Sequence, residues 1–236
     1  MKTRHLAAMA LLSSACAVQA ENWKGNAELG YVAVTGNSES TLLNAGFKVG
    51  KKTEASQHTF AAAVTTAETE GEESAESYSA EWNGKYNLSE RVFAFGDLRY
   101  LDDRFDSFDE IISVGAGFGY RVLDKDTISW DISLGAGYRD TEFEVSGEDA
   151  SQATGLGISA FSYQVSESTQ FTNDTRVESG DENTFIQNVA ALSVAINKTL
   201  SLSIKNDVRH NTETAPEDES TDTITSVNVV YNFGKK

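Results

Sequence analysis

The stretch that decides the fold is the last strand-like segment, residues 226–233, which reads SVNVVYNF and is followed only by three residues, GKK. Its side chains alternate in polarity along the segment. One face holds Val227, Val229, Tyr231 and Phe233, and the other holds Ser226, Asn228, Val230 and Asn232. Apolar and aromatic residues that alternate with mostly small polar ones are typical of a membrane β-barrel strand, which has lipid on one side and the lumen on the other. The segment therefore predicts the closing strand of such a barrel.

The N-terminus has the features of an export signal. Lys2 and Arg4 precede an apolar run at 6–12, and residues 18–20 (VQA) place short residues where a signal peptidase cleaves. The apolar run is too short to cross a bilayer as a helix. We predict a removed signal peptide at 1–20 and a barrel domain at 21–236. The one cysteine, Cys16, lies in the signal, so the mature chain forms no disulfide; lipidation at Cys16 is the alternative, although the usual leucine three residues earlier is absent.

The charge of the chain excludes some partners. The formal net charge is −17, and it becomes −19 when Lys2 and Arg4 leave with the signal. A carboxylate-rich surface does not attract phosphate groups, so we expect no nucleic-acid partner and no binding to an anionic membrane surface. No cofactor motif is present, and we expect none to be bound.

Alternation with a period of two runs through the mature chain. It predicts an all-β fold, a transmembrane antiparallel β-barrel of about twelve strands, because each segment is at least as long as the roughly 9–11 residues of a tilted membrane strand. A change of apolar parity near Ala160 predicts a bulge in the eighth segment. The predicted strands are 23–34, 41–50, 57–67, 77–88, 91–101, 110–122, 127–141, 152–165, 169–179, 185–196, 199–210 and 222–233.

The connections between these segments alternate in length. Short ones at 51–56, 89–90, 123–126, 166–168 and 197–198 are turn-like, whereas those at 68–76, 102–109, 142–151, 179–183 and 211–221 are mostly longer and acidic. Short periplasmic turns and longer external loops are the usual asymmetry of outer-membrane barrels. With an even strand number, both termini are expected in the periplasm. The alternative is a soluble, secreted β-sandwich or barrel, which does not need the aromatic residues found near so many strand ends.

The first predicted hairpin carries a resemblance to a known family. Residues 25–31 read GNAELGY, residues 35–41 read TGNSEST, and the closing segment ends Tyr231-Asn232-Phe233. These motifs are short, and the likeness extends over about 21–236. The chain resembles a family of small Gram-negative outer-membrane proteins of unknown function that are called salt-induced. The resemblance implies an outer-membrane barrel whose expression responds to salt or osmotic conditions, and it brings no catalytic residues.

The residues after the signal do not support an enzyme. A barrel phospholipase needs a serine and a histidine in contact, and an omptin-like protease needs an aspartate and a histidine at the external rim. His58 falls at the periplasmic end by the topology above. His210 has Asp207 three residues away, and residues three apart on a strand face opposite sides. Asp131 and Asp174 could approach each other inside the barrel, but two carboxylates are weak evidence. We predict that the protein is not an enzyme.

The acidic loops are candidates for weak divalent-cation binding. Clustered carboxylates supply the oxygen ligands that Ca²⁺ and Mg²⁺ prefer, although none has the spacing of a dedicated calcium loop. The alternative is that these loops are simply solvated. The candidate ligands are Glu70, Glu72, Glu73, Asp102, Asp103 and Asp106.

The charged residues on the polar faces of the strands are the candidates for a transport function. They include both signs in similar numbers, so they could either close the lumen as salt bridges or line a narrow aqueous channel. The small residues beside them favour a channel. The predicted lumen-lining residues are Lys48, Lys85, Asp97, Arg99, Asp131, Arg139, Asp174, Arg176, Lys205, Asp207 and Arg209.

Together these features predict a monomeric outer-membrane barrel that contacts membrane lipid and lipopolysaccharide and is inserted by the barrel-assembly machinery. Two functions stay open. The first is a narrow, weakly selective channel or an envelope protein of osmotic or salt stress. The second is a non-conducting structural or surface-interaction barrel with cation-binding acidic loops.

Overall fold

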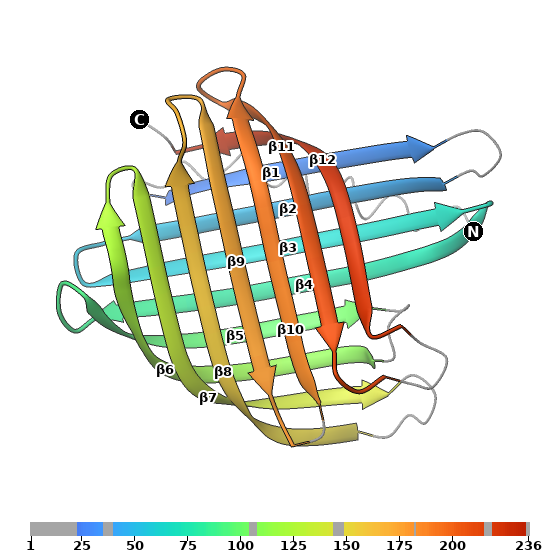
Figure 1. Cartoon of the computed structure of the whole chain (residues 1–236), viewed down its shortest axis with the longest axis horizontal. Helices are drawn as coiled ribbons and strands as arrows, with labels where there is room; N and C mark the ends of the chain where they lie inside the picture. Colours follow the sequence, from blue (N-terminus) through green and yellow to red (C-terminus); the bar gives the residue numbers. More distant parts are fainter. Residues whose placement is uncertain are drawn as a thin grey trace.

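The computed structural model describes residues 23–34, 40–103, 108–143, 149–181, 183–214 and 219–234. The predicted signal peptide at 1–20 lies outside these residues. Figure 1 shows the described strands arranged around a single barrel. Within the described ranges, no helix has the length and apolar character needed to cross a bilayer.

Twelve antiparallel strands form the barrel, so the predicted fold class is confirmed. Each strand pairs with the next one in the sequence, and β1 pairs with β12 to close the barrel, with Gly25 opposite Phe233. The strands are β1 (Trp23–Val34), β2 (Ser40–Lys52), β3 (Ser56–Thr69), β4 (Glu72–Asn87), β5 (Val92–Asp103), β6 (Phe108–Lys125), β7 (Ile128–Phe143), β8 (Asp149–Gln164), β9 (Thr169–Ser179), β10 (Thr184–Ala195), β11 (Leu200–Asn211) and β12 (Thr221–Phe233).

The two ends of the barrel differ in their connections. We call the end at which β1 begins and β12 ends the turn end (upper left in Figure 1), and the opposite end the loop end. Connections at the turn end are short in every case, as predicted. Several strands reach further toward the loop end than the sequence indicated. The predicted loop at 68–76 is in fact a two-residue turn at Glu70 and Gly71, both with positive φ (57° and 84°), which is the backbone of a tight hairpin.

The predicted bulge near Ala160 is wrong. The register between β7 and β8 runs without a shift from Ile128 opposite Tyr163 to Glu142 opposite Asp149. Among the described strand pairs, register shifts occur instead at 67/68 in β3, at 108/110 and at 121/123 in β6. The apolar parity of β8 changes because Leu156 and Ile158 point inward, where the sequence pattern predicted polar residues.

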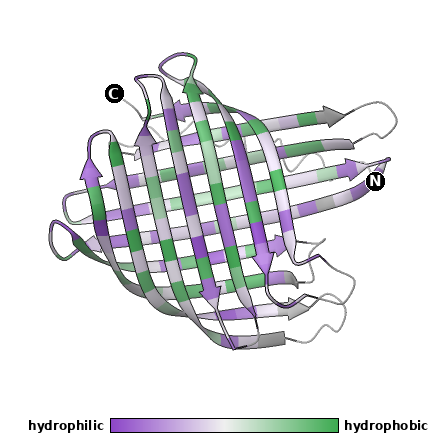
Figure 2. Ribbon diagram, in the orientation of Figure 1, coloured by the Kyte–Doolittle hydropathy of each residue, from purple (hydrophilic) through white to green (hydrophobic). Residues whose placement is uncertain are grey.

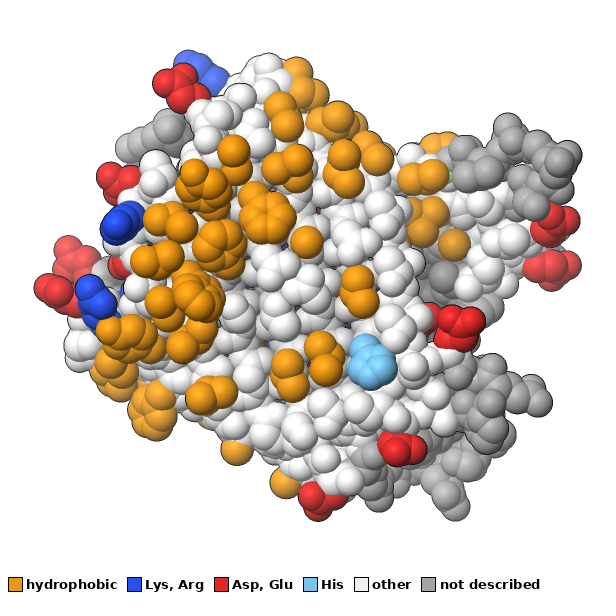
Figure 3. All heavy atoms as spheres, in the orientation of Figure 1, with side chains coloured by type: hydrophobic (Ala, Val, Ile, Leu, Met, Phe, Trp, Pro, Cys, Tyr) orange, Lys and Arg blue, Asp and Glu red, His pale blue; other side chains and the backbone are white. Residues whose placement is uncertain are grey.

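The outer surface of the barrel is largely apolar, and many of the buried residues are polar or charged. Large apolar side chains are exposed on the outer wall, for example Leu134 at 74 %, Phe118 at 65 % and Tyr31 at 62 %. Buried positions include several arginines, serines and asparagines, together with Asp97 and Glu178. Figure 3 shows hydrophobic side chains gathered over the outer surface, with charged ones at the two ends of the barrel. Figure 2 shows hydrophilic and hydrophobic residues alternating along the strands. A twelve-residue strand tilted by about 40° spans roughly 30 Å, enough for the hydrocarbon region of a bilayer.

Candidate functional site in the barrel interior

The lumen contains a cavity of about 400 Å³. Strands β2 to β5 and β7 to β12 contribute to its wall, and small side chains such as Ala61, Ala63, Ser77 and Ser79 leave the space open. Ten of the eleven predicted lumen residues lie on this wall: Lys48, Lys85, Asp97, Arg99, Asp131, Asp174, Arg176, Lys205, Asp207 and Arg209. The eleventh, Arg139, is buried outside the wall, where it lies 3.8 Å from Glu178 and donates to the carbonyl of Asn183 at 3.2 Å.

Arg176 on β9 is the centre of an ion network in the loop-end half of the lumen. Its Nη2 donates to Asp97 on β5 at 2.5 Å, and its Nε donates to Glu178 at 2.5 Å. Glu81 on β4 lies 3.7 Å from its Nη1. Asp97 and Glu178 are 1 % and 2 % exposed. Buried carboxylates are stable as charges only when a cation compensates them, so Arg176 holds β4, β5 and β9 together across the interior.

Two further contacts cross the lumen at this level. Arg99 on β5 donates to Gln187 on β10 at 2.8 Å, and its guanidinium lies 4.9 Å from the centre of the Phe185 ring. Arg209 on β11 donates to Asp103 on β5 at 2.6 Å. The arginines therefore reach from one wall to another and narrow the passage toward the loop end.

The turn-end half of the lumen is less tightly paired. Lys85 on β4 contacts Asp131 on β7 at 2.7 Å, and Lys205 on β11 pairs with Glu28 on β1. Lys48 and Asp174 take part in no ion pair within the described part of the chain, although Lys48 and Lys85 are close enough for their charges to act on Asp174. Asp131 and Asp174 both line the cavity, and the contact that Asp131 makes is with Lys85. Unpaired charges of both signs thus remain available to water and small ions in this half.

One side of the interior is filled by apolar side chains, which the sequence analysis missed. Phe93 and Phe95 of β5 and Leu156 of β8 form a buried cluster with Ile158. Inward-facing glycines of β6 make room for them: a Cβ at Gly119 would lie 2.1 Å from the Phe93 ring, and one at Gly115 would lie 2.6 Å from Leu156. Gly115, Gly117 and Gly119 alternate with apolar residues in the sequence, and this run of glycines was the available signal that neighbouring strands supply bulk there.

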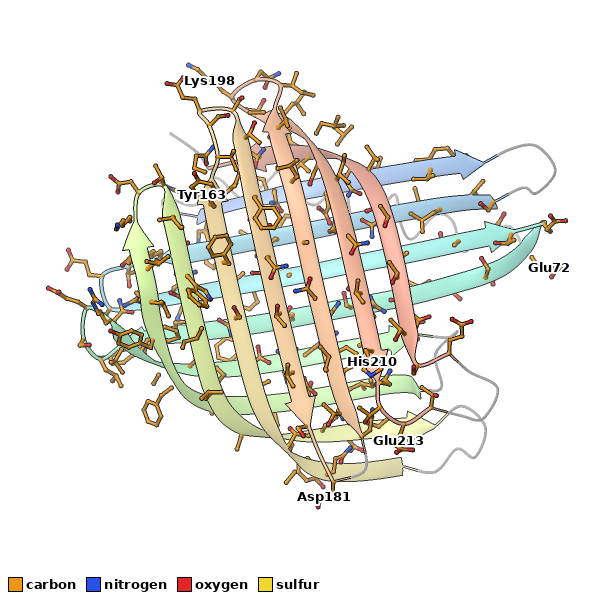
Figure 4. The ribbon with its side chains drawn as sticks, viewed as in Figure 1. Glu72, Tyr163, Asp181, Lys198, His210 and Glu213 are labelled. Atoms are coloured by element: carbon orange, nitrogen blue, oxygen red, sulfur yellow. The ribbon has the colours of Figure 1, made fainter. Side chains whose placement is uncertain are left out.

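Both histidines of the described residues lie at strand ends. His58 stacks on Trp82 with ring centroids 6.0 Å apart, and Nδ1 of His210 lies 2.9 Å from the hydroxyl of Thr221. Figure 4 labels His210 on the β11 side of the loop end. The expectation that the protein is not an enzyme stays a prediction.

The candidate cation ligands do not form one cluster, and two of them contact other side chains. Glu70, Glu72 and Glu73 lie at the tip of the β3–β4 hairpin, where all three are exposed, and Figure 4 labels Glu72 there. Asp102 accepts from the Tyr100 hydroxyl at 3.4 Å, Asp103 pairs with Arg209, and Asp106 lies outside the described residues. Within the described ranges, no three His, Cys, Asp or Glu side chains are grouped to hold a metal ion. Divalent-cation binding stays a prediction.

A closed antiparallel barrel with an apolar exterior and a charged interior has the fold of outer-membrane β-barrels. The chain belongs to the family described as protein of unknown function, DUF481, whose model matches residues 27–233. It is 28 % identical over 215 residues to the uncharacterized protein YdiY of Escherichia coli K12, covering 89 % of this chain and 83 % of that protein. The salt-induced character implied by the resemblance has no support in these matches.

Solved structures share this fold. The NanC porin has a TM-score of 0.53 at 11 % identity, covering 88 % of this chain and 98 % of the porin. The COG4313 outer membrane channel from Pseudomonas putida F1 also has a TM-score of 0.53 at 11 % identity, covering 92 % and 97 %. The translocator domain of autotransporter NalP from Neisseria meningitidis has a TM-score of 0.50 at 12 % identity, covering 97 % and 95 %. At such identities the likeness concerns the fold alone.

Proposed function

We propose that this protein is inserted in the outer membrane and forms a narrow, weakly selective aqueous channel. The observation that carries the proposal is the cavity of about 400 Å³ inside the barrel, which is lined by charged side chains of both signs. Such a cavity holds water, and side-chain charges around a water-filled path set the selectivity of a pore. Mixed charge supports weak rather than strong selectivity.

The outer wall supports the membrane location. Aromatic residues lie near both strand ends, with Tyr86, Tyr120 and Tyr163 toward the turn end and Tyr100 and Tyr138 toward the loop end. Aromatic side chains at these two levels suit the interfaces of a bilayer. Lipid and lipopolysaccharide would contact the apolar wall between them, and the barrel-assembly machinery would insert it. Removal of residues 1–20 is part of the same proposal; N-terminal sequencing of the envelope protein is expected to begin at Glu21.

The contacts across the lumen narrow the path for ions and so lower the expected conductance. Arg209 with Asp103 and Arg176 with Asp97 occupy the section through which an ion has to pass. A twelve-stranded barrel is also smaller than the 16–18-stranded porins with open channels. We therefore expect small conductance steps. A second candidate function, a non-conducting structural barrel, is favoured by these same contacts and by the apolar cluster at Phe93 if they close the lumen completely.

Planar-bilayer recordings separate the two candidates. Wild-type protein is expected to give small steps, and the double variant Arg209→Ala, Asp103→Asn is expected to give larger ones because it removes a contact across the lumen. Asp207 loses its 3.6 Å contact with Arg209 in this variant but keeps its hydrogen bonds from Gln187. Arg91→Ala, in the exposed turn before β5, is the matched control and should leave the steps unchanged. Heat-modifiable migration shows whether each protein has inserted. If wild type and the double variant both insert and neither gives conductance steps, the non-conducting barrel is established instead.

The role in salt or osmotic stress rests on the family resemblance and stays a proposal. Transcript levels in low-salt and high-salt cultures test it, and equal levels would remove it while leaving the channel proposal intact.

A further inference from the structure

The outer wall of β9 to β12 carries two rows in which six of eight residues are polar, where a membrane barrel is expected to be apolar. The residues of each row are paired with one another across neighbouring strands. Along each strand they alternate with residues of the lumen wall such as Asp174, Lys205 and Ser226, so they face outward. The first row is Asn173, Ala190, Asn206 and Thr225, and the second is Thr175, Asn188, Val208 and Thr223. We call these eight residues the polar rows.

The polar rows shorten the apolar belt on this side of the barrel. Toward the turn end, the next row on the same strands is fully apolar, with Phe171, Leu192, Ile204 and Val227. On β12 the apolar outward positions run from Val227 to Phe233, about 20 Å along the strand, whereas on β6 they run from Ile112 to Tyr120, about 26 Å. Figure 3 shows this face, where hydrophobic side chains gather toward the turn end and become sparse beyond it. At a tilt of about 40°, these lengths give belts about 15 Å and about 20 Å tall, against about 25 Å in outer-membrane barrels.

The amides of the polar rows are partly satisfied by one another. Asn188 Nδ2 donates to Thr175 at 2.7 Å and to Asn173 Oδ1 at 3.2 Å, and Asn173 Nδ2 donates to Asn188 Oδ1 at 3.1 Å. Asn206 Nδ2 donates to Thr225 at 2.9 Å, which leaves the carboxamide oxygen of Asn206 without a hydrogen bond in the described part of the chain. A carboxamide has two donor hydrogens and an oxygen that accepts twice, and lipid tails offer partners to neither.

We propose that the polar rows are the contact surface between two copies of this barrel in the membrane. A two-fold axis places the rows of one copy against the rows of the other, and asparagine and threonine supply both donors and acceptors, so the surface is complementary to itself. The rows contain no Asp, Glu, Lys or Arg, so two mature chains of net charge −19 can meet there without burying like charges. The proposal departs from the monomer expected from the sequence, and it rests on the membrane location proposed above but not on conduction.

The size of the wall suits such a contact. Four strands at about 4.8 Å spacing and about 40 Å of strand length give roughly 760 Å². Stable protein interfaces bury about 800 Å² on each partner. This area includes both the polar rows and the apolar residues next to them on β10 to β12.

Cysteine cross-linking in membranes tests the proposal directly. In a Cys16→Ser background, which removes the chain's one cysteine, Asn206→Cys on β11 is expected to give a cross-linked product of twice the monomer mass. Leu98→Cys is the matched control, because it is 48 % exposed on β5, six strands away on the opposite wall, and is expected to stay monomeric. Heat-modifiable migration measures whether both variants are inserted and folded. A variant that does not insert argues against the membrane location, whereas a variant that inserts but does not cross-link argues against the contact between two copies.

A triple variant tests the chemistry of the surface. Asn173→Leu, Asn188→Leu and Asn206→Leu together extend the apolar belt, and mass photometry in lipid nanodiscs is expected to change from dimer in the wild type to monomer in the variant. A wild type that is monomeric in nanodiscs, together with an Asn206→Cys variant that gives no cross-link, overturns the proposal. A cross-link from Asn206→Cys to a chain of another mass, or protection of that cysteine from a maleimide only when lipopolysaccharide is present, overturns the second copy in favour of that occupant. Bilayer conductance plays no part in these outcomes.

Discussion

Arg209 on β11 and Asp103 on β5 form a 2.6 Å contact between opposite walls of the barrel. Five strands lie between β5 and β11 in either direction around the closed sheet, so the pair spans the section from side to side. Both side chains are largely buried, at 10 % and 15 % exposure. The contact means that at this level the passage is no wider than the space left beside one arginine and one aspartate. The lumen is therefore constricted at this level.

Removing the centre of the ion network should destabilise the barrel strongly. Arg176→Met leaves Asp97 and Glu178 buried with less compensation, and breaking a buried ion pair from one side costs about 3–5 kcal/mol. Urea unfolding in lipid vesicles measures this loss. The double variant Arg176→Met, Asp97→Leu should recover part of the stability, since one lone carboxylate is removed. A single variant as stable as wild type would show that water enters this region and compensates the charges.

Filling the glycine face of β6 should also be costly. A methyl group at Gly119 has no room beside Phe93, so Gly119→Ala is expected to lower the free energy of unfolding by about 1–3 kcal/mol through overpacking. The same unfolding assay measures it. Phe93→Leu in the same chain should relieve the clash and make the double variant more stable than Gly119→Ala alone. Additive effects of the two substitutions would contradict the contact.

A cation placed on the outer wall distinguishes a membrane barrel from a soluble one. Leu134 is the most exposed large apolar side chain described, at 74 %, and it lies within β7 on the outer face. Leu134→Arg should cost about 2–4 kcal/mol near the bilayer midplane. Asp126→Arg, in the turn between β6 and β7, is the control and should change stability little. Equal effects at the two positions would argue against lipid contact at Leu134.

Lys48 should influence ion selectivity because it lines the cavity, is exposed there and has no ion-pair partner in the described residues. Lys48→Glu changes the local charge by two units and is expected to shift the reversal potential in a salt gradient toward cation preference. Lys48→Gln should give a smaller shift in the same direction. Lys24→Gln, an exposed lysine at the start of β1, serves as the control. An unchanged reversal potential in all variants would place the ion path away from Lys48.

The strand pattern was predictable because membrane strands alternate with a strict period. On β6, exposed Ile112, Val114 and Phe118 alternate with buried or half-buried glycines and Ser113, as the sequence indicated. The same rule placed the charged lumen residues on the inward faces, since parity within a strand needs no knowledge of its neighbours. Strand ends were less predictable. β4 begins at Glu72 and β6 at Phe108, within segments that were interpreted as loops, because hydrogen bonding to a neighbouring strand extends both strands.

Other features depend on which strands face each other across the lumen. Phe93 and Phe95 are apolar yet inward, and no pattern within β5 explains them; they fill the space left by the glycines of β6. Asp103 was assigned to an acidic loop and considered as a cation ligand, but it ends β5 and pairs with Arg209. Gln187 was not singled out at all, although it accepts from Arg99. Such contacts join residues about 80 to 110 positions apart.

By itself, then, the alternation that begins with residues 226–233 determined that the chain is a barrel of twelve strands with a charged interior, because side-chain direction along a strand is a local property. Only the tertiary structure decided which of those charges meet, that one side of the lumen is packed with apolar side chains, and that the outer wall of β9 to β12 carries polar rows. These features arise from the closure and register of the sheet, which bring distant strands to the same height and to opposite walls.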